Sequence, residues 1–349
     1  MASITGAQTN AIMKIASTFG TAVSGGAGNK LKAEITPNFN AELLKPRQIG
    51  SGVQMIQTAT RGNFKPTWKV AMDGGYRNCF DNFLAQFFGT AGAPTEQTAS
   101  QGDYKHTITF NSSLNAKYLT LAYETSSATV CECPSAAVKA LDISCDDAPG
   151  ILDVSLDLIG NNALITGTTN TNGSMASATA TDVEPIAYAA DDTFRINTSA
   201  GSTLAGGDQY NITGFKLHLE RPQSIKGEIR GAVGNGAPVA DDLFAGTLQL
   251  TVKELADHAF FTYWSAETPL KCAFNIQGSQ IGSGLNKQIT LYIPKMILTQ
   301  EPQYAIASPG VNPVTLNFLI VAATSNPSGM SSFFPYAEVI NQLSTSLLA

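Results

Sequence analysis

The sequence predicts a mainly β protein made of two tandem copies of one β-sandwich or β-barrel unit, each with one flanking α-helix. The first observation behind this prediction is a short motif that occurs twice, as LLKPRQIGSG at residues 43–52 and as LERPQSIKGE at residues 219–228. The second is that alternating apolar and polar residues, typical of strands with one buried face, surround both copies. The third is a change to a helical period at the same place in each half, which a chance match between two motifs would not produce.

Composition is consistent with this class. The chain has 349 residues and is 43% hydrophobic, enough for two domains with packed cores. Only 14% of residues are charged, well below the usual quarter, and small polar residues replace them. A thinly charged surface is typical of a protein that is buried against copies of itself. The net charge of -6 and the lack of a basic cluster argue against a protein that binds nucleic acid through its phosphates.

The first unit begins with a strand, a loop, a strand and a helix. Residues 33–39 (AEITPNF) place apolar side chains at alternate positions, which predicts a strand. A glycine-rich, polar stretch predicts a long exposed loop before the next strand at residues 64–72 (FKPTWKVAM). The period then becomes helical, and Gly89 is placed to end the helix. The apolar face of this helix comprises Phe80, Phe83, Leu84, Phe87 and Phe88.

Strands complete the first unit. They are predicted at residues 106–110, 117–123 and 138–144, and then at 152–158, where leucine and valine alternate strictly with polar residues. Residues 91–104 and 126–136 are rich in Gly, Ser, Thr and Ala, and we expect them to be extra loops of the first unit.

The second unit follows the same order. Strands at residues 213–219 and 244–252 flank a glycine-rich loop, and a helical period comes next, followed by three strands. A strict alternation at residues 314–320 ends the unit. The apolar face of the second helix comprises Leu255, Ala256, Ala259, Phe260, Tyr263 and Trp264, and its later strands are expected at residues 271–276, 288–293 and 295–300.

These patterns divide the chain into four parts. The first domain, with an N-terminal arm, covers residues 1–160, and the second covers residues 186–327. Residues 161–185 are small, polar and nearly uncharged, which predicts a linker or arm. Residues 328–349 are predicted to be a C-terminal tail that either docks on a neighbouring chain or has no fixed contacts.

The sequence offers no sign of catalysis, cofactor binding or metal binding. No phosphate-binding glycine loop or nucleophile elbow is present, and the adjacent aspartates fall in turns, where they bond their own backbone. The chain has five cysteines and no export signal, so we expect it to be made in a cytoplasm and its cysteines to be free thiols. Cys131 and Cys133 have no second pair at matching spacing, so we expect loop thiols rather than half of a metal site.

The order of elements resembles the major tail tube proteins of phages with long, non-contractile tails. In the first half the resemblance is carried by KAEITPNFNAELLKPRQIGSG, RGNFKPTWKVAMDGGYRNCFDNFLAQFFGT and VKALDISCDDAPGILDVSLDLIG. In the second half it is carried by ITGFKLHLERPQSI, DDLFAGTLQLTVKELADHAFFTYW, YIPKMILTQEP and NPVTLNFLIVA, so that it covers most of residues 11–327. It implies two tail-tube-type β-sandwich domains whose sheets join those of neighbouring subunits into a β-barrel. Such rings stack into a tube through which DNA passes, and the protein is a virion component made in the host cytoplasm.

The resemblance also implies which residues meet other chains. The long loop after the first strand of each unit, at residues 45–63 and 221–242, would contact the next ring. The candidate contacts are Arg47, Gln48, Arg61, Arg221 and Arg230, with solvated loop residues as the alternative. Asp153 and Asp157 face away from the apolar side of their strand and are candidates for the lumen, with an outer solvent face as the alternative.

Two units on one chain favour rings of three chains with pseudo-sixfold symmetry. Rings of six chains would follow if the second unit were an outward decoration. Further partners implied by the resemblance are the tape measure, the tail tip and the tail terminator, with no cofactor and no membrane. An adhesive or surface-layer-like β protein is the alternative function, against which the missing export signal counts. A carbohydrate-active enzyme is a third, for which no carboxylate pair or aromatic platform can be distinguished.

Overall fold

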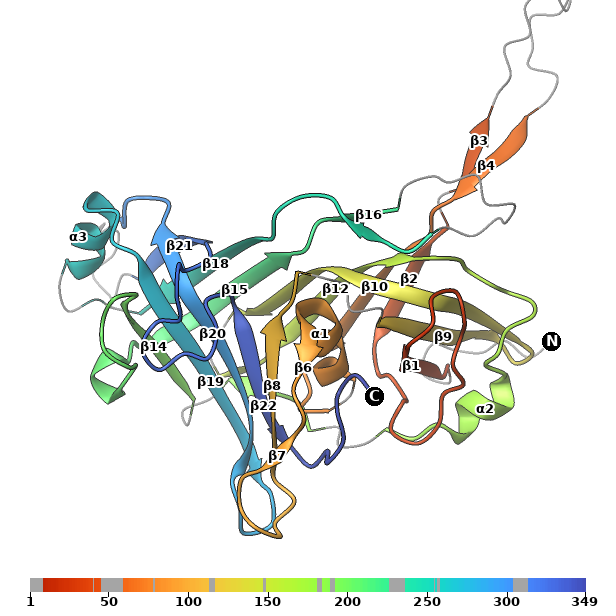
Figure 1. Ribbon diagram of the computed structural model, residues 1–349, viewed down its shortest axis with the longest axis horizontal. Coiled ribbons are helices and arrows are strands. Elements are labelled where there is room, and N and C mark those ends of the chain that lie inside the picture. The colour runs from red at the N-terminus through yellow and green to blue at the C-terminus, as the bar shows by residue number, and fades with distance from the viewer. Residues whose placement is uncertain are drawn as a thin grey trace, which may run out of the picture.

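The protein is a mainly β structure, as predicted (Figure 1). The structure is a computed structural model. It describes residues 9–39, 41–44, 59–77, 79–112, 117–146, 149–180, 184–188, 192–225, 236–253, 255, 258–303 and 313–349.

Six antiparallel strands follow one another in the first half. In spatial order they are β2 (Glu34–Asn38), β5 (Thr67–Asp73), β12 (Asp153–Gly160), β10 (Thr129–Cys145), β9 (Tyr118–Ser126) and β1 (Ala11–Ala16). The long strand β10 takes part in two layers, because one stretch of it pairs with β12 and an earlier stretch with β9. Register shifts on both sides of β10 allow it to bend between the layers.

Six strands of the second half have the same order of antiparallel neighbours. They are β15 (Ile212–Glu220), β18 (Ala245–Val252), β21 (Val314–Ile320), β20 (Asn286–Leu298), β19 (Leu270–Gln280) and β14 (Thr193–Thr198). Here β20 takes the place of β10 and bridges the two layers. In both halves the apolar faces of the layers point at each other and form the core.

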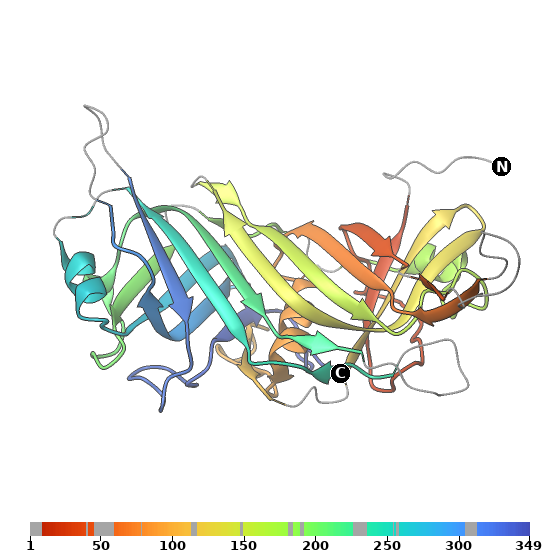
Figure 2. The ribbon, with the colours of Figure 1, turned by 90° about the horizontal axis from the view of Figure 1, so that it is seen from above.

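Two joints connect the halves. The first is the pairing of β10 with β15, which makes one continuous layer of eight strands in the order β2-β5-β12-β10-β15-β18-β21-β20 (Figure 2). The second is β22 (Tyr336–Asn341), which lies between β20 and β8 (Tyr104–Phe110). The prediction of a loose or neighbour-bound tail is therefore wrong for this segment. Its apolar side chains are buried in the sheet of its own chain, where its pairing partners lie far away in the sequence.

Helix α1 (Phe80–Phe88) has the predicted apolar face, and its Phe83, Leu84 and Phe87 are fully buried. Gly89 ends it in the left-handed conformation, at φ 93°, and donates its backbone N–H to Ala85 O. Helix α1 packs on β10, β8, β6 (Gly89–Ala91) and β22. Helix α3 (Ala259–Ser265) lies at the far end of the second half and buries only Phe260 completely (Figure 1).

Two segments predicted as irregular are ordered against the first half. Most of residues 126–136 belong to β10, because their small side chains, including Cys131 and Cys133, are buried between neighbouring elements. The predicted linker contains α2 (Asn172–Ser177). It is held by Asn170, whose backbone N–H and side-chain amide both donate to the buried Glu132 carboxylate, at 2.8 and 2.7 Å.

Short strands complete the fold. The segment between β2 and β5 forms a hairpin of β3 (Ala41–Leu44) and β4 (Thr60–Phe64), and the segment between β15 and β18 pairs β16 (Gln223–Ser224) with β17 (Val239–Ala240). The remaining strands are β7 (Thr95–Glu96), β11 (Gly150–Ile151) and β13 (Ala187–Tyr188).

Candidate functional site

One face of the eight-stranded layer is polar from β2 to β18, and Leu319 of β21 and Ile297 of β20 make its far end apolar. Every second residue of each strand points into the core, as Leu141, Leu156 and Leu217 do, and the residues between them point away from it. Cross-strand pairing places these outward residues in rows. One row is Asp73, Asp153, Ser144, Lys216, Gln249 and Asn317, and the next is Glu34, Ala71, Ser155, Asp142, His218, Thr247 and Leu319.

This polar face is acidic. A third row holds Thr36, Lys69, Asp157, Ala140, Glu220 and Ala245. The three rows together carry six carboxylates and two ammonium groups, besides His218. His218 Nδ1 lies 2.6 Å from Asp142 Oδ1, and Lys216 Nζ lies 2.9 Å from Asp146 Oδ1. The excess of carboxylates gives the face a negative potential.

Asp153 and Asp157 both lie on this face, and both are exposed. Asp153 pairs directly with Asp73 of β5, although like charges on opposite residues destabilise a sheet. Of the six carboxylates on this face, only these two were predicted from the sequence. The other four, Glu34, Asp73, Asp142 and Glu220, were not predicted, although the same alternation in their strands was the signal that could have revealed them.

The hairpin of β3 and β4 projects from the end of the first half (Figure 1). Phe39 stacks on Phe64 at its base, with ring centroids 6.4 Å apart. Among the predicted contact residues, Arg61 lies in β4, whereas Arg47, Gln48 and Arg230 lie outside the described residues.

Arg221 has a different position from the other predicted contact residues. Its side chain is buried, with 4% exposed, and its guanidinium donates to Phe87 O at 3.0 Å and to Asn111 O at 2.7 Å. The same group lies 5.2 Å over the ring of Phe110, and burial lowers the pKa of Arg221. It therefore connects the end of β15 to the last turn of α1 inside its own chain, and not to an exposed loop surface as predicted.

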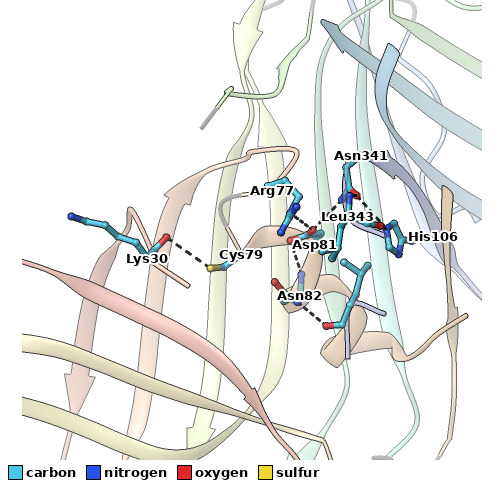
Figure 3. A network of polar contacts seen from close by, with 9 residues as sticks. Lys30, Arg77, Cys79, Asp81, Asn82, His106, Asn341 and Leu343 are labelled. Carbon is cyan, nitrogen blue, oxygen red and sulfur yellow. Dashed lines mark hydrogen bonds and ion pairs between the residues drawn. The ribbon is translucent and has the colours of Figure 1, made fainter. Parts of the chain in front are cut away.

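A buried polar network attaches the C-terminal segment to α1 (Figure 3). Asp81 is fully buried, with Arg77 Nε at 3.4 Å, and Asn341 Nδ2 donates to its Oδ2 at 3.1 Å. His106 Nε2 lies 3.2 Å from Asn341 Oδ1. Asn82 Nδ2 donates to a backbone carbonyl of the same segment, Leu347 O, at 2.7 Å. Burial raises the pKa of the Asp81 carboxyl to about 7, against the opposing effect of Arg77.

The five cysteines are buried free thiols. Burial raises the pKa of Cys133 to about 12 and raises that of Cys79 and Cys272 as well, which keeps these thiols protonated and unreactive. Within the described part of the chain, no three His, Cys, Asp or Glu side chains are grouped so that they can hold a metal ion.

The comparisons with known proteins agree with this architecture. A model of the phage tail tube protein family matches residues 6–319. The chain belongs to the phage tail tube protein family. A comparison with curated proteins found no match. As a member of this family, the tail tube protein is a structural subunit of the phage tail, a virion component that assembles with itself and with other tail proteins. None of the helices described in it has the length and apolar character needed to cross a membrane.

Proposed function

We propose that the tail tube protein self-assembles into stacked rings whose hollow centre conducts DNA into the host. The observation that carries this proposal is the eight-stranded layer, which has one apolar face against the core and an opposite face that is polar over most of its strands. A curved layer of this kind can close into a barrel with water inside when copies join at their edges. We propose no catalytic role, and we place its synthesis in the host cytoplasm.

We further propose that the two halves, residues 1–160 and 186–327, are copies of one unit and that three chains form a ring. The identical order of antiparallel neighbours in both halves supports the duplication. Both halves contribute strands to the same polar face, which favours a trimer over a hexamer with the second half turned outward.

The joint inside the chain suggests the joint between chains. Within the chain, β10 pairs with β15. Since β20 corresponds to β10 and β2 corresponds to β15, the segment that continues β20 would pair with β2 of the next chain. When Ile35 is taken as the counterpart of Leu217, the β10–β15 register transferred to these strands sets Thr299 opposite Thr36 and Glu301 opposite Glu34. β2 is the first strand of the layer and has β5 beside it on one side, and among the strands that the structure describes none pairs with its other edge, which suits such a partner.

The acidic polar face suits a conduit for DNA. Carboxylates repel phosphates, whereas a basic wall would hold DNA by releasing its counterions. We therefore propose that Asp153 and Asp157 line the lumen, together with Glu34, Asp142 and Glu220. The tail tube protein should show no affinity for duplex DNA at moderate salt, and tight binding there would contradict the conduit.

The projecting hairpin of β3 and β4 suits contacts between rings (Figure 1). We propose that residues 45–63 and 221–242, with Arg47, Gln48, Arg61 and Arg230, meet the adjacent ring. The tape measure, the tail tip and the tail terminator are the proposed partners at the lumen and at the two ends of the tube.

Electron microscopy of the purified protein, averaged down the particle axis, tests the ring. We expect three chains around a central hole. Six chains would retain the tube but overturn the trimer, and assemblies without a hole would overturn the conduit.

A cysteine pair tests the joint. In assemblies of a Thr36→Cys, Thr299→Cys double variant, oxidation should link chains covalently into trimers. The matched control is Thr36→Cys with Thr315→Cys, which places the second thiol on the same polar face but on β21, away from the proposed joint. The buried native thiols should contribute little background. Equal crosslinking in both variants, or none in the first, would refute the register.

A further inference from the structure

The layer formed by β14, β19 and β20 in the second half carries a small polar cavity. Its floor is formed by two rows of side chains across β14, β19 and β20. One row is Thr193, Asn275 and Thr290, and the other is Arg195, Ala273 and Tyr292. The small side chain of Ala273 lies between two large ones, and this leaves a hollow of about 130 Å³ that these rows line.

Two loop segments cover the hollow. Thr203 and Leu204 line it from one side and Ser328–Met330 from the other. The two segments meet where Thr203 Oγ1 and Ser328 Oγ lie 3.1 Å apart. Gly329 has φ +77°, and a Cβ added there would lie 2.4 Å from Thr203 Cγ2, so the close approach of the two segments requires glycine.

A cation without a counter-charge faces this cavity. Arg195 Nε is buried, and within the described part of the chain its side chain has no hydrogen bond or ion pair. Asn275 Oδ1 is likewise buried without a partner there. Buried polar atoms are nearly always paired, and an unpaired one in an interior carries a large desolvation cost.

The carboxylate of Glu338, which contacts Tyr292 at this floor, has other partners. Glu338 forms an ion pair with Lys105 at 2.9 Å and accepts the Tyr292 hydroxyl at 3.4 Å. A second cation, the fully buried Lys271, donates to the carbonyls of Gly201 and Ser328 in the covering loops, which adds positive charge beside the hollow.

We propose that this cavity binds a small tetrahedral oxyanion of the phosphate or sulfate class. The guanidinium of Arg195 would donate charge-assisted hydrogen bonds to it. Rotation of the Asn275 amide by 180° turns its NH₂ group toward the same anion. The side chains of Thr193 and Thr290 line the same floor, and the hollow is large enough for one such ion. This site is independent of ring assembly, since all its walls come from one chain.

Titration of the protein with inorganic phosphate, followed by ³¹P NMR, tests the proposal. We expect saturable binding that is roughly ten- to a hundredfold weaker in Arg195→Gln, because this variant loses charge-assisted hydrogen bonds to the anion. Lys69→Gln is the matched control, since it removes one cation from the polar face, away from the cavity, and should bind as the native protein does. Ala273→Leu fills the hollow while retaining Arg195 and should abolish binding.

Thermal unfolding provides a second readout that does not depend on NMR. Phosphate stabilises many proteins by exclusion from their surface, so the melting temperature is compared in phosphate and chloride at equal ionic strength for each variant. A phosphate-dependent rise that is lost in Arg195→Gln but kept in Lys69→Gln supports the site. An equal rise in melting temperature in all variants, or phosphate binding that does not saturate, would overturn the proposal. The cavity would then be filled by water. Glycerol phosphate as a second probe separates a free ion from a phosphate ester: binding of both indicates an opening to solvent, and binding of inorganic phosphate alone an enclosed site.

Discussion

Replacement of Asp81 by asparagine should stabilise the tail tube protein at neutral and alkaline pH. The pKa of this carboxyl rises from 3.8 to about 7 in the folded chain, because burial disfavours its charged form more than Arg77 favours it. At about 1.4 kcal/mol per pKa unit, this difference corresponds to about 4 kcal/mol. A raised folded pKa means that the folded state binds the proton more tightly. Stability is therefore lost as the pH rises from the unfolded pKa to the folded one.

Asparagine has nearly the same shape and no charge to bury. It can still accept from Asn341 Nδ2, so the network to the C-terminal segment is retained. We expect the native protein to lose up to about 4 kcal/mol of unfolding free energy between pH 4 and pH 8 through this group, and Asp81→Asn to lose none of it. Urea unfolding of the unassembled chain at pH 5 and pH 8 measures the difference.

Asp103→Asn is a control of opposite sign. Burial raises the pKa of Asp103, but the hydrogen bonds its carboxylate accepts from the backbone N–H groups of Leu285 and Thr98 outweigh it and lower the pKa overall. A lowered folded pKa adds stability above the unfolded pKa, so this variant should be less stable than the native protein at pH 8. Two results would refute the reasoning about burial. One is an Asp81→Asn variant less stable than the native protein at pH 8. The other is a gain in unfolding free energy over the native protein that is the same at pH 5 and pH 8.

Three further predictions concern other parts of the molecule. Asp153→Asn relieves the repulsion from Asp73 on the neighbouring strand and should raise the unfolding free energy by roughly 0.2–1 kcal/mol; a lower melting temperature of the unassembled chain would contradict this. Arg221→Met leaves buried carbonyl groups without donors and should cost roughly 1–3 kcal/mol for each of them, measured in urea. Phe83→Ala in α1 should cost roughly 3–5 kcal/mol, whereas Phe261→Ala in α3, where the ring is 40% exposed, should cost far less, and equal losses would mean that burial does not decide the cost.

The sequence pattern alone was enough to predict those elements whose buried face can be read from residues close to one another in the chain. The helix at α1 and the alternation in β12 are of this kind, since spacing alone identified the face that the core covers. The acidic face could be predicted in part, because Asp153 and Asp157 alternate with apolar residues. Its extent across both halves could not, because it depends on the pairing of β10 with β15.

Elements that depend on distant partners were not recognisable. Strand β22 has an apolar pattern, but the strands beside it, β8 and β20, belong to different halves of the chain. The start of β10 was predicted as a loop because small residues such as Cys131 and Cys133 are typical of turns when no neighbour is known. Arg221 was predicted as a surface contact because nothing near it in sequence shows that the carbonyls of α1 and β8 lie within its reach.

The position of β22 has a consequence for synthesis of the chain on the ribosome. Its residue Asn341 reaches back 235 residues to His106, so β8 leaves the ribosome long before the strand that completes its sheet. Until then the edges of β8 and β20 are exposed, and pairing over such long separations is slow. A product of premature termination before residue 336 would have both of these open edges permanently. Completion of translation is therefore a condition for the closed fold, and truncated chains would be poor building blocks for a tube that depends on every subunit.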